Sequence, residues 1–189
     1  MKKILYAIAL CAAGMMTSCL GNGVEDQYKD WNEANQKWFN EQMIRIGSDG
    51  KPYYEVIAAD WDPNARILMH WYNDRSLTEE NLSPLYTSMV DVKYKGTLYN
   101  GTPFDSSYLS TSPREGVTRF SIGQSGTSNG VIEGWAIALQ NMHVGDSCHV
   151  IINYQQGYGV INYGTTIKPY SVLQFDMKLD DIYKYEAAH

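Results

Sequence analysis

The histidines, cysteines and glycines of this chain lack the spacings that build most catalytic or metal-binding centres. The four histidines, at positions 70, 143, 149 and 189, form no His-Glu-x-x-His pattern, and no Cys-x-x-Cys pair occurs. The glycines at positions 123, 126 and 130 do not form the fingerprint of a nucleotide-binding loop. If the protein is an enzyme, we expect its chemistry to need no metal, no cofactor and no obvious nucleophile.

Composition limits the kinds of partner. The 189 residues are 44% hydrophobic, which is enough for one globular domain with an extension. A net charge of −6 and a pI near 5.1 argue against a nucleic-acid surface, because such surfaces depend on clustered Lys and Arg. The 15 tyrosines combine an apolar ring with a hydrogen-bonding hydroxyl, which suits a moderately wet binding cleft or the edge of a core.

The N-terminus has the features of a secretory signal. Two lysines precede an apolar run from Ile4 to Met16 that is too short to span a membrane. Residues 16–19, Met-Thr-Ser-Cys, resemble the lipobox of bacterial lipoproteins. This predicts removal of residues 1–18 and lipidation of Cys19, with a plain signal peptide as the alternative. The lipidated protein would be extracytoplasmic and anchored to a bacterial membrane by its acyl chains.

Cysteine usage agrees with an exported protein that has no internal disulfide. Cys11 would leave with the signal and Cys19 would carry the lipid, so that Cys148 alone remains. Cys148 lies in an alternating apolar run, and we therefore expect a buried core thiol in place of a nucleophile.

An amphipathic helix is expected after a short tether at residues 20–23. Apolar and aromatic residues recur at helical spacing between positions 24 and 46, while charged residues occupy the other face. Gly47 and the Ser-Asp-Gly that follows it end the helix. The apolar face must bury against something, either the protein's own domain or a second copy. We therefore expect a monomer or a dimer through residues 24–46.

After Pro52 the hydrophobic period changes to two, which predicts strands. These strands are expected near residues 53–59, 66–72, 90–95, 118–122, 148–154 and 173–179. Asn100-Gly101 is typical of a hairpin turn, and a short apolar helix is expected at 131–142. Such a helix must cover one face of the strands. The expected fold class is therefore α+β, with a curved antiparallel sheet of five to six strands wrapped on one short helix.

Seven motifs occur in an order that resembles the FKBP family of peptidyl-prolyl cis-trans isomerases. They are Val-Asp-Val-Lys-Tyr-Lys-Gly-Thr-Leu (90–98), Asn-Gly-Thr-Pro-Phe-Asp-Ser-Ser (100–107), Phe-Ser-Ile-Gly (120–123), Val-Ile-Glu-Gly-Trp (131–135), Ala-Leu-Gln-Asn-Met-His-Val-Gly-Asp (138–146), Gly-Tyr-Gly (157–159) and Leu-Gln-Phe-Asp-Met-Lys-Leu (173–179). The resemblance covers roughly residues 86–183. It implies an isomerase domain at 86–185, preceded by a strand extension at 51–85 and by the lipidated tether and helix at 19–50.

The resemblance implies a dry aromatic pocket that catalyses rotation about Xaa-Pro bonds. Trp135 would form its floor, and the Ile132 N–H and the Tyr158 hydroxyl would bind substrate carbonyls. Asp105 would be a buried polar partner of Tyr94. The walls and rim would be formed by Tyr94, Phe104, Phe120, Val131, Ile132, Tyr163, Ile167 and Phe175. The residue pattern alone would assign most of these side chains to an ordinary core.

Some residues depart from the family's pattern. Thr118 stands where a larger wall residue is usual, and Tyr163 and Thr166 replace common residues of the flap before the last strand. Our first hypothesis is a lipid-anchored isomerase that assists folding of exported, proline-containing polypeptides and is open to macrolide inhibitors of the FK506 type. The second is a binding module or chaperone of the same fold with little or no turnover. A glycan-binding lipoprotein that uses exposed aromatics is the third.

Overall fold

The computed structural model describes residue 23 and residues 27–109 and 116–183. The predicted signal peptide and Cys19 lie outside these residues. Within the described ranges, no helix is long and apolar enough to cross a membrane.

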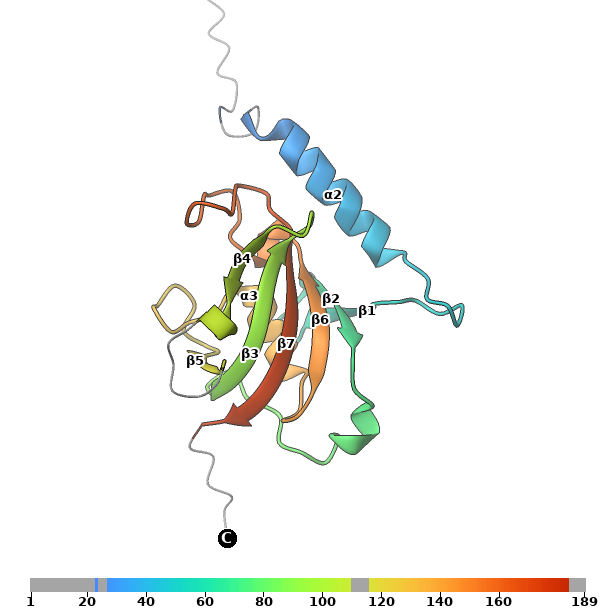
Figure 1. Ribbon diagram of the computed structural model, residues 1–189, viewed down its shortest axis with the longest axis vertical. Coiled ribbons are helices and arrows are strands. Elements are labelled where there is room, and N and C mark those ends of the chain that lie inside the picture. Colours follow the sequence, from blue (N-terminus) through green and yellow to red (C-terminus); the bar gives the residue numbers. More distant parts are fainter. Residues whose placement is uncertain (1–22, 24–26, 110–115, 184–189) are drawn as a thin grey trace, which may run out of the picture.

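One antiparallel sheet of seven strands forms the centre of the protein (Figure 1). The strands are β1 (Glu55–Ala59), β2 (Asp62–Trp71), β3 (Met89–Leu98), β4 (Pro103–Ser106), β5 (Thr118–Ser121), β6 (Ser147–Ile152) and β7 (Leu173–Ile182). Their order is β1-β2-β6-β7-β3-β4, and β5 pairs with β3 beyond the end of β4. The β3–β4 turn lies at Asn100-Gly101 as expected, with Gly101 at a φ of 83°.

The α+β class and the antiparallel sheet are confirmed, but the sheet has seven strands in place of five to six. Residues 103–106 form β4, whereas no strand was expected there. β1 and β2, expected as an extension, join the same sheet because Ile67–Trp71 pairs in register with β6. The division of the chain at residue 85 stays a prediction, although both parts contribute strands to one sheet.

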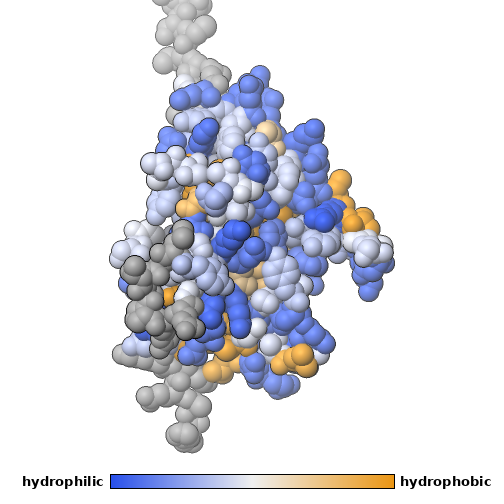
Figure 2. Space-filling model, viewed as in Figure 1, coloured by the Kyte–Doolittle hydropathy of each residue, from blue (hydrophilic) through white to orange (hydrophobic). Residues whose placement is uncertain are grey.

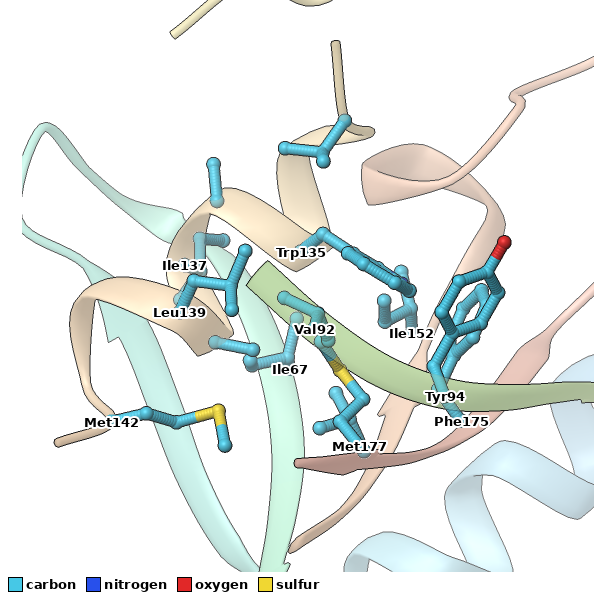
Figure 3. Close-up of a cluster of buried hydrophobic side chains, with 14 of the residues drawn as sticks. Ile67, Val92, Tyr94, Trp135, Ile137, Leu139, Met142, Ile152, Phe175 and Met177 are labelled. Carbon is cyan, nitrogen blue, oxygen red and sulfur yellow. The ribbon is translucent and has the colours of Figure 1, made fainter. Parts of the chain in front are cut away.

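The main core lies between the sheet and the short helix α3 (Glu133–Gln140), in which six of eight residues are buried. Figure 3 shows Ile137 and Leu139 of α3 facing Ile67 and Val92 from the strands. Gly134 permits this contact, because a Cβ at that position would come within 2.5 Å of the Ile152 side chain. A side chain at position 134 would therefore force Ile152 or the helix to move.

Cys148 belongs to this core, as expected. Its side chain is fully buried and Sγ lies 3.8 Å from the sulfur of Met142. Burial raises the pKa of the Cys148 thiol far above its ordinary value, so the group stays a neutral thiol.

The first described helix, α2 (Lys29–Met43), lies against the other face of the sheet (Figure 1). Phe39 packs there with buried residues of β2 and β6, and Trp31 and Trp38 contact the ring of Tyr99 edge to face. The helical face is thus buried on the protein's own domain, one of the two partners considered above. Met43 and Ile46 are exposed, contrary to the expected face, because the helix ends at Met43. Figure 2, drawn in the same view as Figure 1, shows that the surface of this face is mostly hydrophilic.

A buried asparagine joins α2 to the segment that precedes β7. Asn35 is 0% exposed; its amide donates to the Trp31 carbonyl at 2.7 Å, and its oxygen accepts from the Val172 N–H at 2.8 Å. Since Val172 is also buried, loss of this acceptor would leave its N–H unpaired.

We expect Asn35→Ala to lower the free energy of unfolding by about 1–3 kcal/mol, the cost of an unsatisfied buried donor. Urea denaturation measures the effect. Asn40→Ala, on the exposed face of the same helix, is the matched control and should leave the midpoint nearly unchanged. Equal midpoints for the two variants would contradict the assigned role of Asn35.

Cross-strand pairing brings His70, His149 and Asp176 side by side on the outer face of the sheet. The Tyr54 hydroxyl lies 3.2 Å from His149 Nδ1. Burial lowers the pKa of His149 from its ordinary value of 6.5, His70 and Arg45 act in the same direction, and Asp176 opposes them. The unfolded chain therefore takes up this proton at a higher pH than the folded chain.

Because of this difference, His149 should make the fold less stable as the pH falls through about 6.5, the pKa of the unfolded chain. We expect the free energy of unfolding to drop more between pH 7.5 and pH 5.5 in the wild type than in His149→Gln. Urea titrations at the two pH values measure this drop. An equal loss in both proteins would show that another group causes the acid sensitivity.

Candidate active site

An aromatic pocket of about 200 Å³ opens at the N-terminal end of α3. Trp135 lies at its base and is 4% exposed. Strands β3, β4, β5 and β7 supply the walls, together with the loops before α3 and before β7. The lining residues are Tyr94, Phe104, Asp105, Phe120, Ser125, Gly126, Thr127, Gly130, Val131, Ile132, Trp135, Tyr158, Tyr163 and Phe175.

Three rings hold the Trp135 indole from its sides. The centroids of Tyr94, Phe120 and Phe175 lie 4.9, 5.1 and 5.2 Å from it, at angles of 85°, 71° and 86°. Figure 3 shows the indole extending from α3 towards Tyr94 and Phe175. These edge-to-face contacts favour one ring orientation. The base of the pocket is therefore flat, apolar and fixed in place.

Gly96 in β3 lets two further rings approach. A Cβ there would come within 2.7 Å of the Phe104 ring and 3.0 Å of the Phe175 ring. Phe104 and Phe175 meet edge to face at 5.5 Å directly above this glycine. Beside them, the Ser107 hydroxyl accepts from the Tyr94 N–H at 2.9 Å and ties the end of β4 to β3.

Tyr94 and Asp105 form the expected hydrogen bond. The Tyr94 hydroxyl donates to the carboxylate at 2.7 Å, and the Ser106 N–H donates to its other oxygen at 2.8 Å. Burial, and then the neighbouring carboxylate, raises the pKa of Tyr94 far above its ordinary value. Asp105 itself is exposed, contrary to expectation, because β4 is an edge strand and the carboxylate lies at the rim of the pocket.

The Tyr158 ring closes one side of the pocket and stacks on Tyr163 at 4.0 Å and 16°. Burial raises the pKa of the Tyr158 hydroxyl well above its ordinary value, so that it remains a neutral donor. Tyr163 is exposed and covers the outer face of Tyr158.

A backbone donor lies at the start of α3. Ile132 is the residue before the helix and has an extended conformation, with φ −67° and ψ 157°. Its carbonyl accepts from the N–H groups of Trp135 and Ala136, whereas its own N–H has no acceptor among the described residues. The first N–H groups of a helix are unpaired within it, so this end can bind a carbonyl oxygen.

Ten of the eleven pocket residues expected from the sequence line the pocket. Ile167 is the exception: it is 4% exposed and lies in an adjoining hollow of about 210 Å³ that shares Phe104, Asp105, Tyr158 and Tyr163 with the pocket. Thr118 is not among the lining residues; it pairs with Val92 in β5.

The loop between β5 and α3 also lines the pocket, which was not expected from the sequence. Ser125, Gly126, Thr127 and Gly130 border the opening. At Gly130 a Cβ would overlap the carbonyl of Gln124, so only glycine fits this turn. The cluster of glycines in this segment was the available signal.

The same loop also contains Gly-x-Ser-x-Gly, residues 126–130, a pattern that carries the nucleophile of some hydrolases. Here Ser128 lies in an exposed turn. Among the described histidines, the ring nitrogens bond to Tyr53, Arg75 and Tyr54, and none bonds to Ser128. The loop therefore offers the pocket a turn and no activated hydroxyl.

Known proteins are similar to this chain in sequence and in fold. The family pattern of the FKBP-type peptidyl-prolyl cis-trans isomerases matches residues 83–180. The chain is 40% identical over 100 residues to the macrophage infectivity potentiator of Trypanosoma cruzi, covering 53% of this chain and 46% of that protein. It is 38% identical over 103 residues to the FKBP-type 22 kDa peptidyl-prolyl cis-trans isomerase of Escherichia coli, covering 54% and 45%. It thus matches less than half the length of both relatives.

Solved structures extend the likeness beyond the family pattern. A peptidyl-prolyl cis-trans isomerase from Pseudomonas syringae superposes with a TM-score of 0.60 and 26% identity, covering 82% of this chain and 95% of that one. FkpA from Escherichia coli gives 0.62 and 25%, covering 85% and 63%. With the pocket described above and the match over residues 83–180, this chain belongs to the FKBP-type peptidyl-prolyl cis-trans isomerase family.

Proposed function

We propose that this protein is a peptidyl-prolyl cis-trans isomerase that acts without covalent or acid–base chemistry. Rotation about an Xaa-Pro bond breaks no bond, and its barrier of about 18–20 kcal/mol comes from amide resonance. In the twisted amide this resonance is weakest and the carbonyl carries less charge. A dry site favours that state over both planar forms and so lowers the barrier by differential binding.

The observation that carries the proposal is the fixed Trp135 floor below two neutral hydrogen-bond donors. The proline ring would lie on the indole, between Tyr94 and Phe175. The Ile132 N–H and the Tyr158 hydroxyl would each hold a substrate carbonyl. Asp105 would keep Tyr94 in place through their hydrogen bond.

Proline-containing polypeptides are therefore the proposed substrates, and macrolides of the FK506 type would compete for the same pocket. Val131, Phe104, Phe120 and Tyr163 would contact the residues around the proline. Ile167 would contact the substrate further from the proline, in the adjoining hollow that it lines.

A binding module or chaperone with little turnover is the second candidate function. It is favoured by Thr118, which adds nothing to the pocket wall, and by Tyr163, which covers the outer face of Tyr158. Such a protein would bind proline-containing segments with the same residues and release them unchanged.

Substitutions at the floor and at the donor separate the two candidates. In an assay of Xaa-Pro peptide isomerisation, we expect Trp135→Ala to lower kcat/KM by about 100-fold and Tyr158→Phe by about 5-fold, losses of about 3 and 1 kcal/mol of transition-state stabilisation. Tyr154→Phe, on the same loop outside the pocket, is the matched control and should keep full activity.

Thermal unfolding of each variant shows whether it is folded, which matters because Trp135 is part of the core. No acceleration by the folded wild type above the uncatalysed rate would exclude the isomerase. Peptide binding without acceleration would instead support the binding module.

We further propose that the protein is a lipoprotein on the extracytoplasmic side of a bacterial membrane, where it assists folding of exported proteins. The proposal rests on the sequence of residues 1–19, with its lysines, apolar run and Met-Thr-Ser-Cys. Cys19 would carry the acyl chains, and the residues before α2 would serve as the tether.

Cys19→Ser should move the protein from the membrane fraction to the soluble fraction, because the variant has no acyl chains to anchor it. Fractionation and labelling with a radioactive fatty acid measure this change. Cys148→Ser is the control, since that thiol is buried in the core and should not affect labelling. Equal labelling of wild type and Cys19→Ser would exclude the lipid anchor at this residue.

Of the two oligomeric states considered above, we propose the monomer. Support comes from α2, whose Trp31, Trp38 and Phe39 are occupied by contacts within the chain.

A further inference from the structure

Two half-exposed aromatic side chains lie beside the pocket, and the proposed reaction does not use them. Trp61, in the turn between β1 and β2, is 48% exposed, and Tyr86, between β2 and β3, is 49% exposed. Their rings meet edge to face with centroids 5.7 Å apart. Single exposed apolar residues are ordinary, but paired aromatic rings in contact are typical of binding surfaces.

Both rings are held in position. Trp61 Nε1 donates to the Glu133 carboxylate at 3.3 Å. Tyr86 lies over Gly123, where a Cβ would come within 2.8 Å of the Tyr86 carbonyl oxygen and 2.9 Å of its ring. Rings that are already fixed lose little conformational entropy when they bind a ligand.

The same contacts place the pair next to the pocket. Glu133 directly follows Ile132, whose N–H is one of the two proposed donors to the substrate. One residue step, one glutamate side chain and the 3.3 Å hydrogen bond together place the Trp61 indole nitrogen no more than about 13 Å from that N–H. About three to four extended residues can span this distance. Figure 3 shows the β1–β2 hairpin running beside α3, in agreement with this position.

We propose that Trp61 and Tyr86 form a second binding surface for the polypeptide whose proline occupies the pocket. This surface takes an apolar or aromatic side chain about three residues from the proline, on the side of the carbonyl bound by Ile132. The occupant is the substrate chain itself, because Glu133, which holds Trp61, directly follows Ile132 of the pocket lining. The Glu133 carboxylate at the edge disfavours an acidic residue there. The inference rests on the function proposed for the pocket.

Peptides with one common Xaa-Pro pair test this surface. One peptide has four residues. The others are longer and carry either Phe or Asp at a position three residues from the proline. Each of these is made twice, once with the test residue before the proline and once with it after the proline. In the wild type we expect the Phe peptide to have a kcat/KM at least about 5-fold above the Asp peptide, on one side only. Trp61→Ala and Tyr86→Ala should each remove most of this preference and change kcat/KM for the four-residue peptide by less than about 2-fold.

Tyr72→Ala is the matched control, because it removes a ring that is 55% exposed on the outer face of the sheet. A preference for Phe that survives in Trp61→Ala and Tyr86→Ala, or is lost equally in Tyr72→Ala, would overturn the proposal. So would sedimentation showing that the two variants only abolish self-association, since the pair would then serve a second copy of the chain.

Direct binding of the fluorescent Phe peptide separates this proposal from the proposed function. If the wild type does not accelerate isomerisation but binds the peptide at least about 5-fold more tightly than Trp61→Ala does, the second binding surface is supported and the isomerase activity is excluded. If the four-residue peptide is isomerised and neither binding nor kcat/KM distinguishes the Phe peptide from the Asp peptide, the isomerase activity is supported and the second binding surface is excluded.

Discussion

The close contact between α3 and β6 determines where the pocket can form. Gly134 brings the helix backbone against the Ile152 side chain, and any larger residue would force either that side chain or α3 to shift. Because the helix is held there, Trp135, the residue after Gly134, packs among rings from β3, β5 and β7. The dry floor is thus a property of backbone packing as much as of the tryptophan.

The fold class could be predicted from local patterns, whereas most of the pocket could be predicted only from the family resemblance that the order of the motifs carries. Alternation in β3 and β7 indicates which residues face α3, and the order of the motifs indicates that Tyr94, Phe104 and Phe175 share one site. Cross-strand register then makes their meeting inevitable: Gly96 stands opposite Phe175 and Asp105 on its two neighbours. The facing of these side chains therefore follows from short stretches of sequence.

Features that depend on a distant partner could not be predicted in this way. Asn35 looks like a solvent-facing residue of a helix, and its burial follows only from an N–H 137 residues away. Asp105 is exposed because β4 lies at an edge, and β2 extends the sheet because β6 offers it a free side. Ile167 lines the adjoining hollow because its loop turns back at Tyr163.

The donor at Ile132 belongs to the main chain, and this has a consequence for how the protein tolerates sequence change. Side-chain replacement at this position leaves the N–H where it is, with proline as the one residue type that removes it. Substitutions at residue 132 other than proline would therefore leave this backbone donor in place. The position of this N–H depends instead on glycines such as Gly130 and Gly134, where a Cβ would clash with neighbouring atoms and change the path of the backbone.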